Sequence, residues 1–263
     1  MPNNTVEIED LVFSRGRRMV LDHVSLNIPQ GSVVAIMGPS GVGKTTVLHL
    51  MSGHLMPDSG GVRLFGQDVT RLSHGAMYEL RREVGVLLQN GALFTDLTVF
   101  ENVATPLREH TQLPEALIRR QVMIKLSSVG LGGTEELMPS ELSGGMARRV
   151  ALARAVVLDP KLMLYDEPMT GLDPIAVSTV RRLIRETNDT LDMTSIIVTH
   201  NVSQMLQLVD FCYILVNGKI AGAGRPDQLL ESDDPGVRQF MNGTVEGPIP
   251  FQYTGPENWS LAN

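Results

Sequence analysis

The glycine-rich segment 38–45 restricts the fold of this chain more than any other feature. Its sequence, Gly38-Pro39-Ser40-Gly41-Val42-Gly43-Lys44-Thr45, fits the pattern G-x-x-x-x-G-K-[ST] of a phosphate-binding loop. The continuous apolar stretch 33–37 precedes it and is typical of a strand buried on both faces. Residues 45–51 then predict a helix that ends near Gly53. Strand, glycine loop and helix in this order are the context that the motif requires, and they indicate a nucleotide-binding α/β protein.

This loop supplies the groups that bind a chain of phosphates. Its glycines let backbone N–H groups point inward, and the start of the following helix adds positive potential. Lys44 is expected to neutralise the β- and γ-phosphates, and the Thr45 hydroxyl to bind Mg²⁺. The alternative, a glycine-rich turn with a solvated lysine, is disfavoured by the flanking strand and helix. The expected nucleotide-binding residues are Gly38, Pro39, Ser40, Gly41, Val42, Gly43, Lys44, Thr45 and Thr46.

Two carboxylates follow a second apolar stretch. Residues 162–165 predict a buried strand, and Asp166 and Glu167 stand at its carboxyl end. An acid pair there is often only a solvated strand end, but beside a phosphate loop it suits metal chemistry. Asp166 is expected to hold Mg²⁺ through water, and Glu167 to act as general base on the attacking water. His200 ends the apolar stretch 195–199, and its place at a strand end favours a functional role.

Shorter signals predict further elements. Thr98 and Glu101 form a capping-box pattern before an apolar run, which predicts the start of a helix. Pro114 is typical of a first helical turn and predicts another helix after it. Asn217-Gly218 between two apolar stretches is a strong β-hairpin signal. These signals place helices in the middle of the chain and antiparallel strands toward its end.

The order of these elements predicts the fold class. Strands and helices alternate on both sides of the stretch 90–158, which is itself helical in pattern. Such alternation predicts an α/β fold with a mainly parallel sheet wound by helices. We expect one nucleotide-binding domain at 1–243, with 90–158 inserted as a helical lobe. The tail at 244–263, rich in proline, glycine and polar residues, is expected to be extended.

Composition disfavours several classes of function. The net charge of −7 argues against broad nucleic-acid binding. The lone cysteine, Cys212, allows no internal disulfide, and we expect it to be a buried strand residue in a reducing compartment. The N-terminus has no signal-peptide pattern, and every apolar stretch is far shorter than the roughly 20 residues of a membrane helix. We therefore expect a cytosolic chain whose transport pathway, if it drives transport, lies on another polypeptide.

Leu142-Ser143-Gly144-Gly145 resembles the signature of ATP-binding-cassette ATPases, and the other motifs of that family stand around it in order. Gln89 matches the glutamine loop, where it would also bind Mg²⁺, and Asp173 matches the aspartate of the loop after the acid strand. His200 matches the switch histidine that contacts the γ-phosphate. The resemblance covers about residues 5–240. It implies ATP hydrolysis by a P-loop core with an N-terminal antiparallel β part. It also implies a head-to-tail dimer, in which the signature residues Ser143, Gly144 and Gly145 cap the nucleotide held by the other chain.

One position departs from the family pattern. An aromatic residue usually stacks on adenine shortly after the first strand, and by spacing that position is Arg15. A guanidinium also stacks on a purine, so Arg15 is the expected adenine contact. Phe13, two residues earlier, is the alternative, and it suits the core equally well.

A second resemblance is narrower. Met146 at the fifth signature position, together with the segments 90–96, 107–111 and 237–240, resembles the ATPase subunits of Mla-type phospholipid transporters. This implies ATP-driven phospholipid transport between inner and outer membranes. The implied partners are a second copy of the chain, a membrane permease, a periplasmic MCE-domain lipid-binding protein and a STAS-domain protein. The implied location is the cytoplasmic face of the inner membrane, reached through the permease.

Other functions remain as alternatives. The ATPase subunit of an importer for another solute shares all the common motifs, because this subunit does not touch cargo. Family members in DNA repair or translation usually carry coiled-coil or zinc insertions or a second cassette, and this sequence shows none. A P-loop kinase or GTPase is disfavoured by the signature and by His200.

Two further segments suggest contacts with partners. Apolar residues crowd the segment after Gln89, which predicts either a docking surface for a permease helix or ordinary lobe core; they are Leu93, Phe94, Leu97, Val99 and Phe100. The tail carries two prolines and two aromatics between residues 248 and 253, which suits an extended segment that docks on the other ATPase copy. A disordered end is the alternative for the tail.

Overall fold

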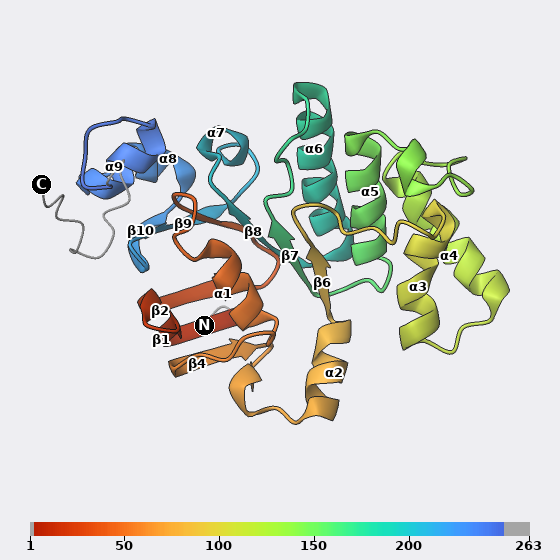
Figure 1. Ribbon diagram of the computed structural model, residues 1–263, viewed down its shortest axis with the longest axis horizontal. Helices are drawn as coiled ribbons and strands as arrows, with labels where there is room; N and C mark the ends of the chain where they lie inside the picture. The colour runs from red at the N-terminus through yellow and green to blue at the C-terminus, as the bar shows by residue number, and fades with distance from the viewer. Residues whose placement is uncertain (1–2, 250–263) are drawn as a thin grey trace, which may run out of the picture.

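The computed structural model describes residues 3–249, which form two β-sheets with helices around them (Figure 1). The larger sheet consists of β3 (Val33–Met37), β6 (Val84–Leu87), β7 (Leu162–Asp166), β8 (Thr194–Thr199), β9 (Phe211–Val216) and β10 (Lys219–Gly224). Its order is β10-β9-β3-β8-β7-β6, and every pair is parallel except β10 with β9. The smaller, antiparallel sheet has the order β2-β1-β4-β5. Its strands are β1 (Asn4–Arg15), β2 (Arg18–Pro29), β4 (Ser59–Leu64) and β5 (Gln67–Asp68). The predicted α/β class with an N-terminal antiparallel part is confirmed.

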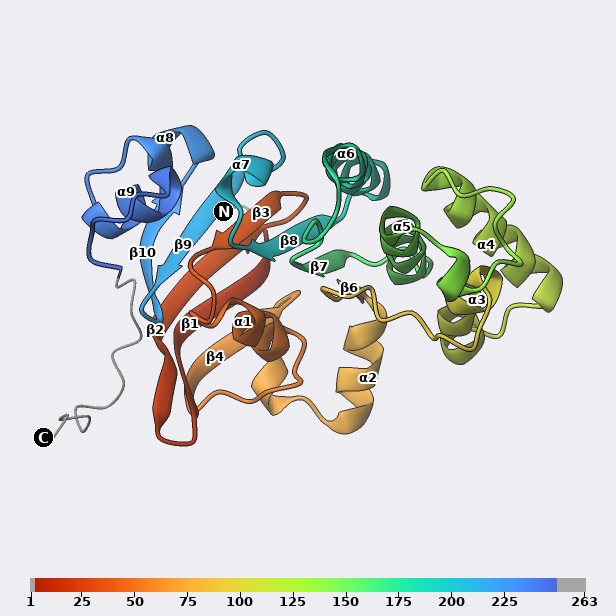
Figure 2. The ribbon, with the colours of Figure 1, turned by 45° about the horizontal axis from the view of Figure 1, so that its top comes forward.

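The helices surround the sheets, and two groups of them lie at opposite ends of the molecule (Figures 1 and 2). The helices are α1 (Lys44–Met51), α2 (His74–Arg82), α3 (Val99–His110), α4 (Glu115–Ser128), α5 (Gly144–Ala155), α6 (Pro174–Leu191), α7 (Val202–Met205), α8 (Pro226–Leu230) and α9 (Pro235–Asn242). In Figures 1 and 2, α3, α4 and α5 lie together at one end, and α8 and α9 lie at the other. The helical lobe predicted at 90–158 contains α3 to α5; its boundaries stay a prediction.

Strand β3 shows why a buried parallel strand is apolar throughout. All five of its side chains are buried, and they alternate between two cores. Val33, Ala35 and Met37 join a core that extends to α3, α5 and α6. Val34 and Ile36 join a second core, which contains α1 and the smaller sheet. Because both faces of the sheet are covered, period-two alternation of polarity is absent from this strand.

The local sequence signals have the expected structural effect. Asn217 and Gly218 both have positive φ, 49° and 77°, and they join β9 to β10 as a tight hairpin. Thr98 caps α3 by accepting a hydrogen bond from the Glu101 backbone N–H at 3.2 Å. The Glu101 carboxylate pairs with Arg108 instead of returning to Thr98, so half of the predicted capping box forms. Pro114 stands directly before α4, as predicted.

The segment after α9 is held by one buried amide. Gln239, which is 7% exposed, donates to the carbonyls of Val245 and Ile249 and accepts from the Ile249 N–H at 2.7 Å. A side chain at Gly247 would meet Gln239 Oε1 at 2.3 Å, so this close approach requires glycine. The aromatic residues predicted to dock, Phe251 and Tyr253, lie outside the described residues.

Composition led to two expectations, a buried cysteine and the lack of a membrane-spanning stretch. Cys212 lies in β9 with no exposed surface, and burial raises the pKa of its thiol to about 12. A neutral thiol of this kind behaves as a small core side chain. Among residues 3–249, no helix combines the length and the apolar character that crossing a membrane requires.

Asn102 organises the chain between β6 and α3. Its side chain has no exposed surface, and its Oδ1 accepts from the Phe94 N–H at 2.8 Å. Its amide nitrogen donates to the carbonyls of Phe94, Leu97 and Thr98 at 3.0–3.1 Å. A single buried side chain therefore satisfies the polar backbone groups of an irregular segment that lies just after Gln89.

We predict that Asn102→Leu lowers the free energy of unfolding by about 3 kcal/mol, because it leaves buried backbone groups without partners. The measurement is urea denaturation of the full chain. Asn242 makes one exposed bond to the Arg238 carbonyl, and Asn242→Ala should change stability by less than about 0.5 kcal/mol. Equal stability of the two variants would contradict the importance of the buried amide.

Candidate nucleotide-binding site

The phosphate loop joins β3 to α1, and its lysine side chain is hydrogen-bonded to the backbone of the loop. The Lys44 ammonium donates to the carbonyl oxygens of Gly38 and Pro39 at 2.8 and 2.9 Å. Lys44 is 7% exposed, and burial lowers the pKa of its amine. Gly43, the residue before the helix, has φ of 111°, a conformation that favours glycine. A cation at the start of a helix, bonded only to neutral carbonyls, is suited to receive a phosphate.

A cavity of about 510 Å³ lies against this loop at the carboxyl ends of the parallel strands. It is lined by Arg15, Arg18, Val20, Ser40, Gly41, Gly43, Lys44, Thr45, Thr46, Gln89, Glu167 and His200. The structure therefore brings the three predicted catalytic residues, Gln89, Glu167 and His200, to the same cavity as Lys44. Among the other predicted loop residues, Gly38 and Pro39 contact Lys44, while Pro39 and Val42 line an adjoining cavity of about 300 Å³.

Glu167 is the most constrained side chain of the site. Its backbone φ is 47°, an uncommon conformation for a residue with a side chain. Its Oε1 accepts from the His200 backbone N–H at 3.0 Å and lies 2.7 Å from His200 Nδ1. Its Oε2 accepts from the hydroxyls of Thr199 and Thr170 at 2.9 and 3.2 Å. Strained backbone of this kind gathers at functional sites, and here the bonds fix a carboxylate at the edge of the cavity.

The residues predicted to hold Mg²⁺ fit a hard cation. The Thr45 hydroxyl donates to Asp166 Oδ1 at 3.1 Å, so a hydroxyl and a carboxylate oxygen already lie together. Gln89 adds an amide oxygen on the same cavity. Burial raises the pKa of Asp166, which means that its charge is poorly solvated and would favour a cation nearby. Within residues 3–249 no group of three or more His, Cys, Asp or Glu side chains is placed to hold a metal ion.

Two arginines also line the cavity. Arg15 and Arg18 are register partners across the β1–β2 hairpin, and both line the cavity beside Val20. Phe13, the alternative adenine contact, is 7% exposed and belongs to the core of the smaller sheet. Sequence reasoning missed Arg18, because the fold sets its position opposite Arg15 across the hairpin.

The signature residues do not line this cavity. Ser143 caps α5 by accepting from the Met146 N–H at 3.2 Å, and it is exposed. Asp173 caps α6 through bonds to the N–H groups of Ile175 and Ala176 at 2.9 and 3.0 Å. Gly144 and Gly145 begin α5 without joining the cavity. The structure thus places an exposed helix start outside the nucleotide cavity, as a signature that serves another copy would require.

The apolar segment after Gln89 is divided between core and surface. Val99 and Phe100 are buried in the core shared by α3 to α6. Phe94 is 47% exposed, and Leu88 is 43% exposed. The lobe-core interpretation therefore holds for Val99 and Phe100, and docking of a permease helix on the exposed part stays a prediction.

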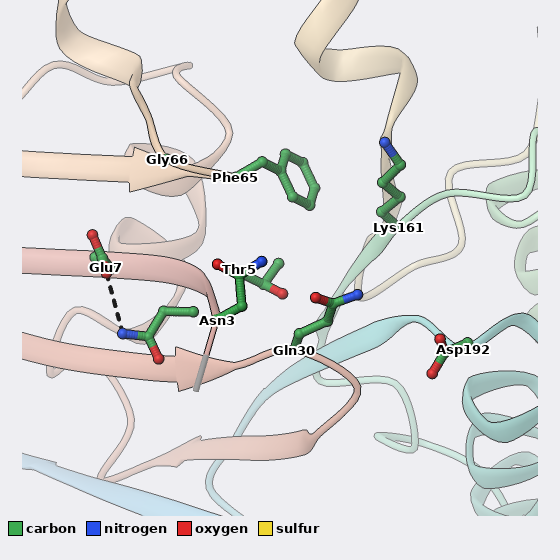
Figure 3. A pocket seen from close by; sticks show the side chains of 9 residues that line it. Asn3, Thr5, Glu7, Gln30, Phe65, Gly66, Lys161 and Asp192 are labelled. Carbon is green, nitrogen blue, oxygen red and sulfur yellow. Dashed lines mark hydrogen bonds between the residues drawn. The ribbon is translucent and has the colours of Figure 1, made fainter. Parts of the chain in front are cut away.

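A second cavity of about 510 Å³ lies at the opposite ends of the strands, shown in Figure 3. The residues before β3, β7 and β8 contribute to it, among them Gln30, Lys161 and Asp192. Its lining cation, Lys161, pairs with Glu83 at 2.6 Å and lies over the Phe65 ring. The remaining charges of the lining, Glu7 and Asp192, are negative and unsuited to phosphate.

Comparison with known proteins gives a family and a class of relatives. The family described as "ABC transporter" matches residues 21–170. A Haemophilus influenzae protein is 51% identical over 253 residues, which cover 96% of each chain. It is named "Intermembrane phospholipid transport system ATP-binding protein MlaF".

Solved structures agree with this assignment. The cbiO1 protein of Clostridium perfringens, described as part of the ABC transporter complex cbiONQ, has a TM-score of 0.81 and 29% identity, covering 88% of this chain and 92% of its own. The ATP-binding cassette MJ0796, in a dimeric post-hydrolysis state bound to ADP and Pi, has a TM-score of 0.77 and 28% identity. The match covers 84% of this chain and 98% of the MJ0796 chain.

We predict that Arg15→Ala and Arg18→Ala each raise KM for ATP by roughly threefold to tenfold, because each removes a guanidinium that lines the cavity and can stack on a purine. The measurement is steady-state ATPase kinetics. Arg17 lies between them in sequence but does not line the cavity, so Arg17→Ala should leave KM within about twofold. A KM that depends equally on all three would reflect only the charge of the hairpin.

Proposed function

This chain belongs to the ABC transporter family, and we propose that it is the ATP-hydrolysing subunit of a transporter that moves phospholipids between the inner and outer membranes. The observation that supports the enzymatic part most directly is the fixed Glu167 carboxylate on the cavity that Lys44 lines. Phospholipid as the cargo is supported by a relative, an intermembrane phospholipid transport ATP-binding protein, that is 51% identical over almost the whole chain.

Each residue of the site has a distinct part in hydrolysis. Lys44 and the backbone N–H groups of the loop bind the phosphates of ATP and offset their charge. The Glu167 carboxylate accepts a proton from a water molecule as its oxygen attacks the γ-phosphorus. The bond from that phosphorus to the bridging oxygen breaks, leaving ADP and inorganic phosphate. His200, already 2.7 Å from Glu167, is placed to contact the γ-phosphate at the same edge.

Thr45, Asp166 and Gln89 would hold Mg²⁺. When bound, the ion would neutralise charge on the β- and γ-phosphate oxygens. Thr45 and Asp166 are already hydrogen-bonded, so little rearrangement is needed to present both oxygens. The Thr45 hydroxyl is also the main group that stabilises the buried charge of Asp166, and a cation would add to that stabilisation.

A second copy of the chain would complete the site. The exposed start of α5, with Ser143, Gly144 and Gly145, offers N–H groups to an anion but does not face its own cavity. A head-to-tail dimer brings this helix start to the nucleotide of the partner, with the Asp173 loops meeting between the two sites. The dimeric state of the related cassette MJ0796 supports this arrangement.

The transport pathway would lie on other chains. A membrane permease would dock beside Gln89, where Phe94 and Leu88 leave apolar surface exposed. We place the subunit at the cytoplasmic face of the inner membrane, attached through that permease. An MCE-domain lipid-binding protein in the periplasm and a STAS-domain protein would complete the complex; the resemblance to Mla-type transporters supports both.

We predict that Glu167→Gln reduces ATP turnover by roughly a hundredfold or more while ATP binding survives, because the variant keeps the shape of the site and loses the base. The measurements are ATPase rate and nucleotide retention, and ATP should hold two copies together. Glu231→Gln makes the same substitution at an exposed glutamate and serves as the control. Wild-type turnover in Glu167→Gln would contradict the role of Glu167.

The cargo is tested by purifying the tagged chain gently from its native membranes and identifying what accompanies it by mass spectrometry. We expect a permease, an MCE-domain protein and enriched phospholipid. A permease with a solute-binding protein and no enriched lipid would leave the ATPase chemistry standing and overturn the cargo. That outcome would favour an importer of another solute.

A further inference from the structure

Arg148 is a buried arginine whose function the nucleotide site does not explain. It lies in α5, one turn after the signature residues, and is 7% exposed. In the described part of the chain its guanidinium has no carboxylate within salt-bridge distance, and burial lowers its pKa. It donates instead to two backbone carbonyls, those of Leu88 at 3.1 Å and Thr170 at 3.4 Å. Burying a cation whose hydrogen-bond partners are neutral costs free energy, so we expect these two contacts to serve a function.

The first contact fixes the turn that carries Gln89. The Gly91 N–H donates to the Leu88 carbonyl at 2.8 Å and closes a turn with Gln89 and Asn90 at its centre. Arg148 binds the carbonyl at one end of this turn. Arg154, also in α5, binds the Gly91 carbonyl at the other end at 2.7 Å. Gln89 is therefore held on a turn whose two ends are bonded to the signature helix.

The second contact reaches the turn that carries Glu167. The Thr170 N–H donates to the Glu167 carbonyl at 3.2 Å, and the Thr170 hydroxyl donates to Glu167 Oε2 at 3.2 Å. Arg148 binds the carbonyl of this same threonine. One guanidinium thus bridges two turns that are far apart in sequence and supply different catalytic groups to one cavity.

We propose that Arg148 is a positioning residue, which sets Gln89 and Glu167 relative to each other and ties both to the signature helix α5. The proposal rests on the proposed ATPase function. It adds a physical path by which engagement of α5 by a second copy reaches the cavity of the same chain. A shift of α5 moves the guanidinium, and the two carbonyls that it binds move with it.

The geometry of the side chain explains why arginine stands here. A guanidinium presents N–H groups in a fixed planar fork, so two of its nitrogens can bind separate carbonyls at once. Here Nη1 binds Leu88 and Nη2 binds Thr170. Lysine keeps the charge at one centre and holds the two turns less rigidly. Methionine has similar length and no donor, so it releases both carbonyls.

The test compares kcat and KM of the full chain in its purified complex. For Arg148→Met we expect kcat to fall about tenfold to a hundredfold, because a misplacement of about 1 Å in catalytic groups is enough for that loss. KM for ATP should stay within about threefold, since Arg148 does not line the cavity. Arg148→Lys should recover part of kcat.

Lys125→Met is the matched control. Lys125 is a buried cation of the helical lobe that pairs with Asp159 and touches neither turn. It should lower the melting temperature without lowering kcat by more than about twofold. If Arg148→Met does not fold, Arg148→Gln, which keeps one amide donor, replaces it with the same expected split between kcat and KM.

The outcomes separate this proposal from the function on which it rests. Unchanged kcat in Arg148→Met, or an equal fall in Lys125→Met, overturns the positioning role. The role is also overturned if the loss of kcat in Arg148→Met is explained by the fraction of unfolded protein alone and Arg148→Lys does not recover any of it. If the wild-type chain itself does not hydrolyse ATP, or Glu167→Gln hydrolyses it normally, the proposed function fails instead.

Discussion

Parallel pairing of β3, β7 and β8 decides where the chemistry of this chain lies. Because β3 pairs in parallel with β8, and β7 with both β8 and β6, their carboxyl ends meet at one edge of the sheet. Lys44, Glu167 and His200 each follow one of these strands, and Gln89 follows β6. Residues spread over more than half of the sequence thereby line one cavity, and the buried strands make their positions rigid. A strand out of register would remove one catalytic group from the site.

The charges of Lys44 and Asp166 are poorly solvated, which suits the site to a charged ligand. Lys44 is bonded to neutral carbonyls, and Asp166 is a desolvated carboxylate with one hydroxyl partner. In the described part of the chain neither group forms a salt bridge, although the nearby charges of Asp166 and Glu167 favour the charged form of Lys44. A nucleotide with its cation would supply a negative charge to the lysine and a positive charge to the aspartate. Glu167 differs, because four donors already satisfy its carboxylate.

The sequence predicted those parts of the molecule in which local chemistry determines structure. The phosphate loop, the acid pair after β7 and the Asn217-Gly218 hairpin have compositions that few conformations satisfy, and each was predicted correctly in position. Helix α2, the strands β4 and β5, and the partial burial of the segment after Gln89 depend on tertiary packing, which periodicity alone does not give. Arg18 and Arg148 were missed for the same reason. Their neighbours in space, the nucleotide cavity and two distant carbonyls, are visible only after the chain has folded.

We propose that each nucleotide cavity needs the signature of a second chain, and mixing two inactive variants tests this most directly. Lys44→Ala removes the phosphate-binding lysine, and Ser143→Arg blocks the signature. A mixed dimer would contain one cavity with both an intact lysine and an intact signature. An equal mixture should therefore regain about a quarter of the wild-type ATPase rate, since half of randomly formed dimers carry one intact site. If each variant alone is inactive and the mixture stays inactive, the signature does not act on the partner's nucleotide and the account is wrong.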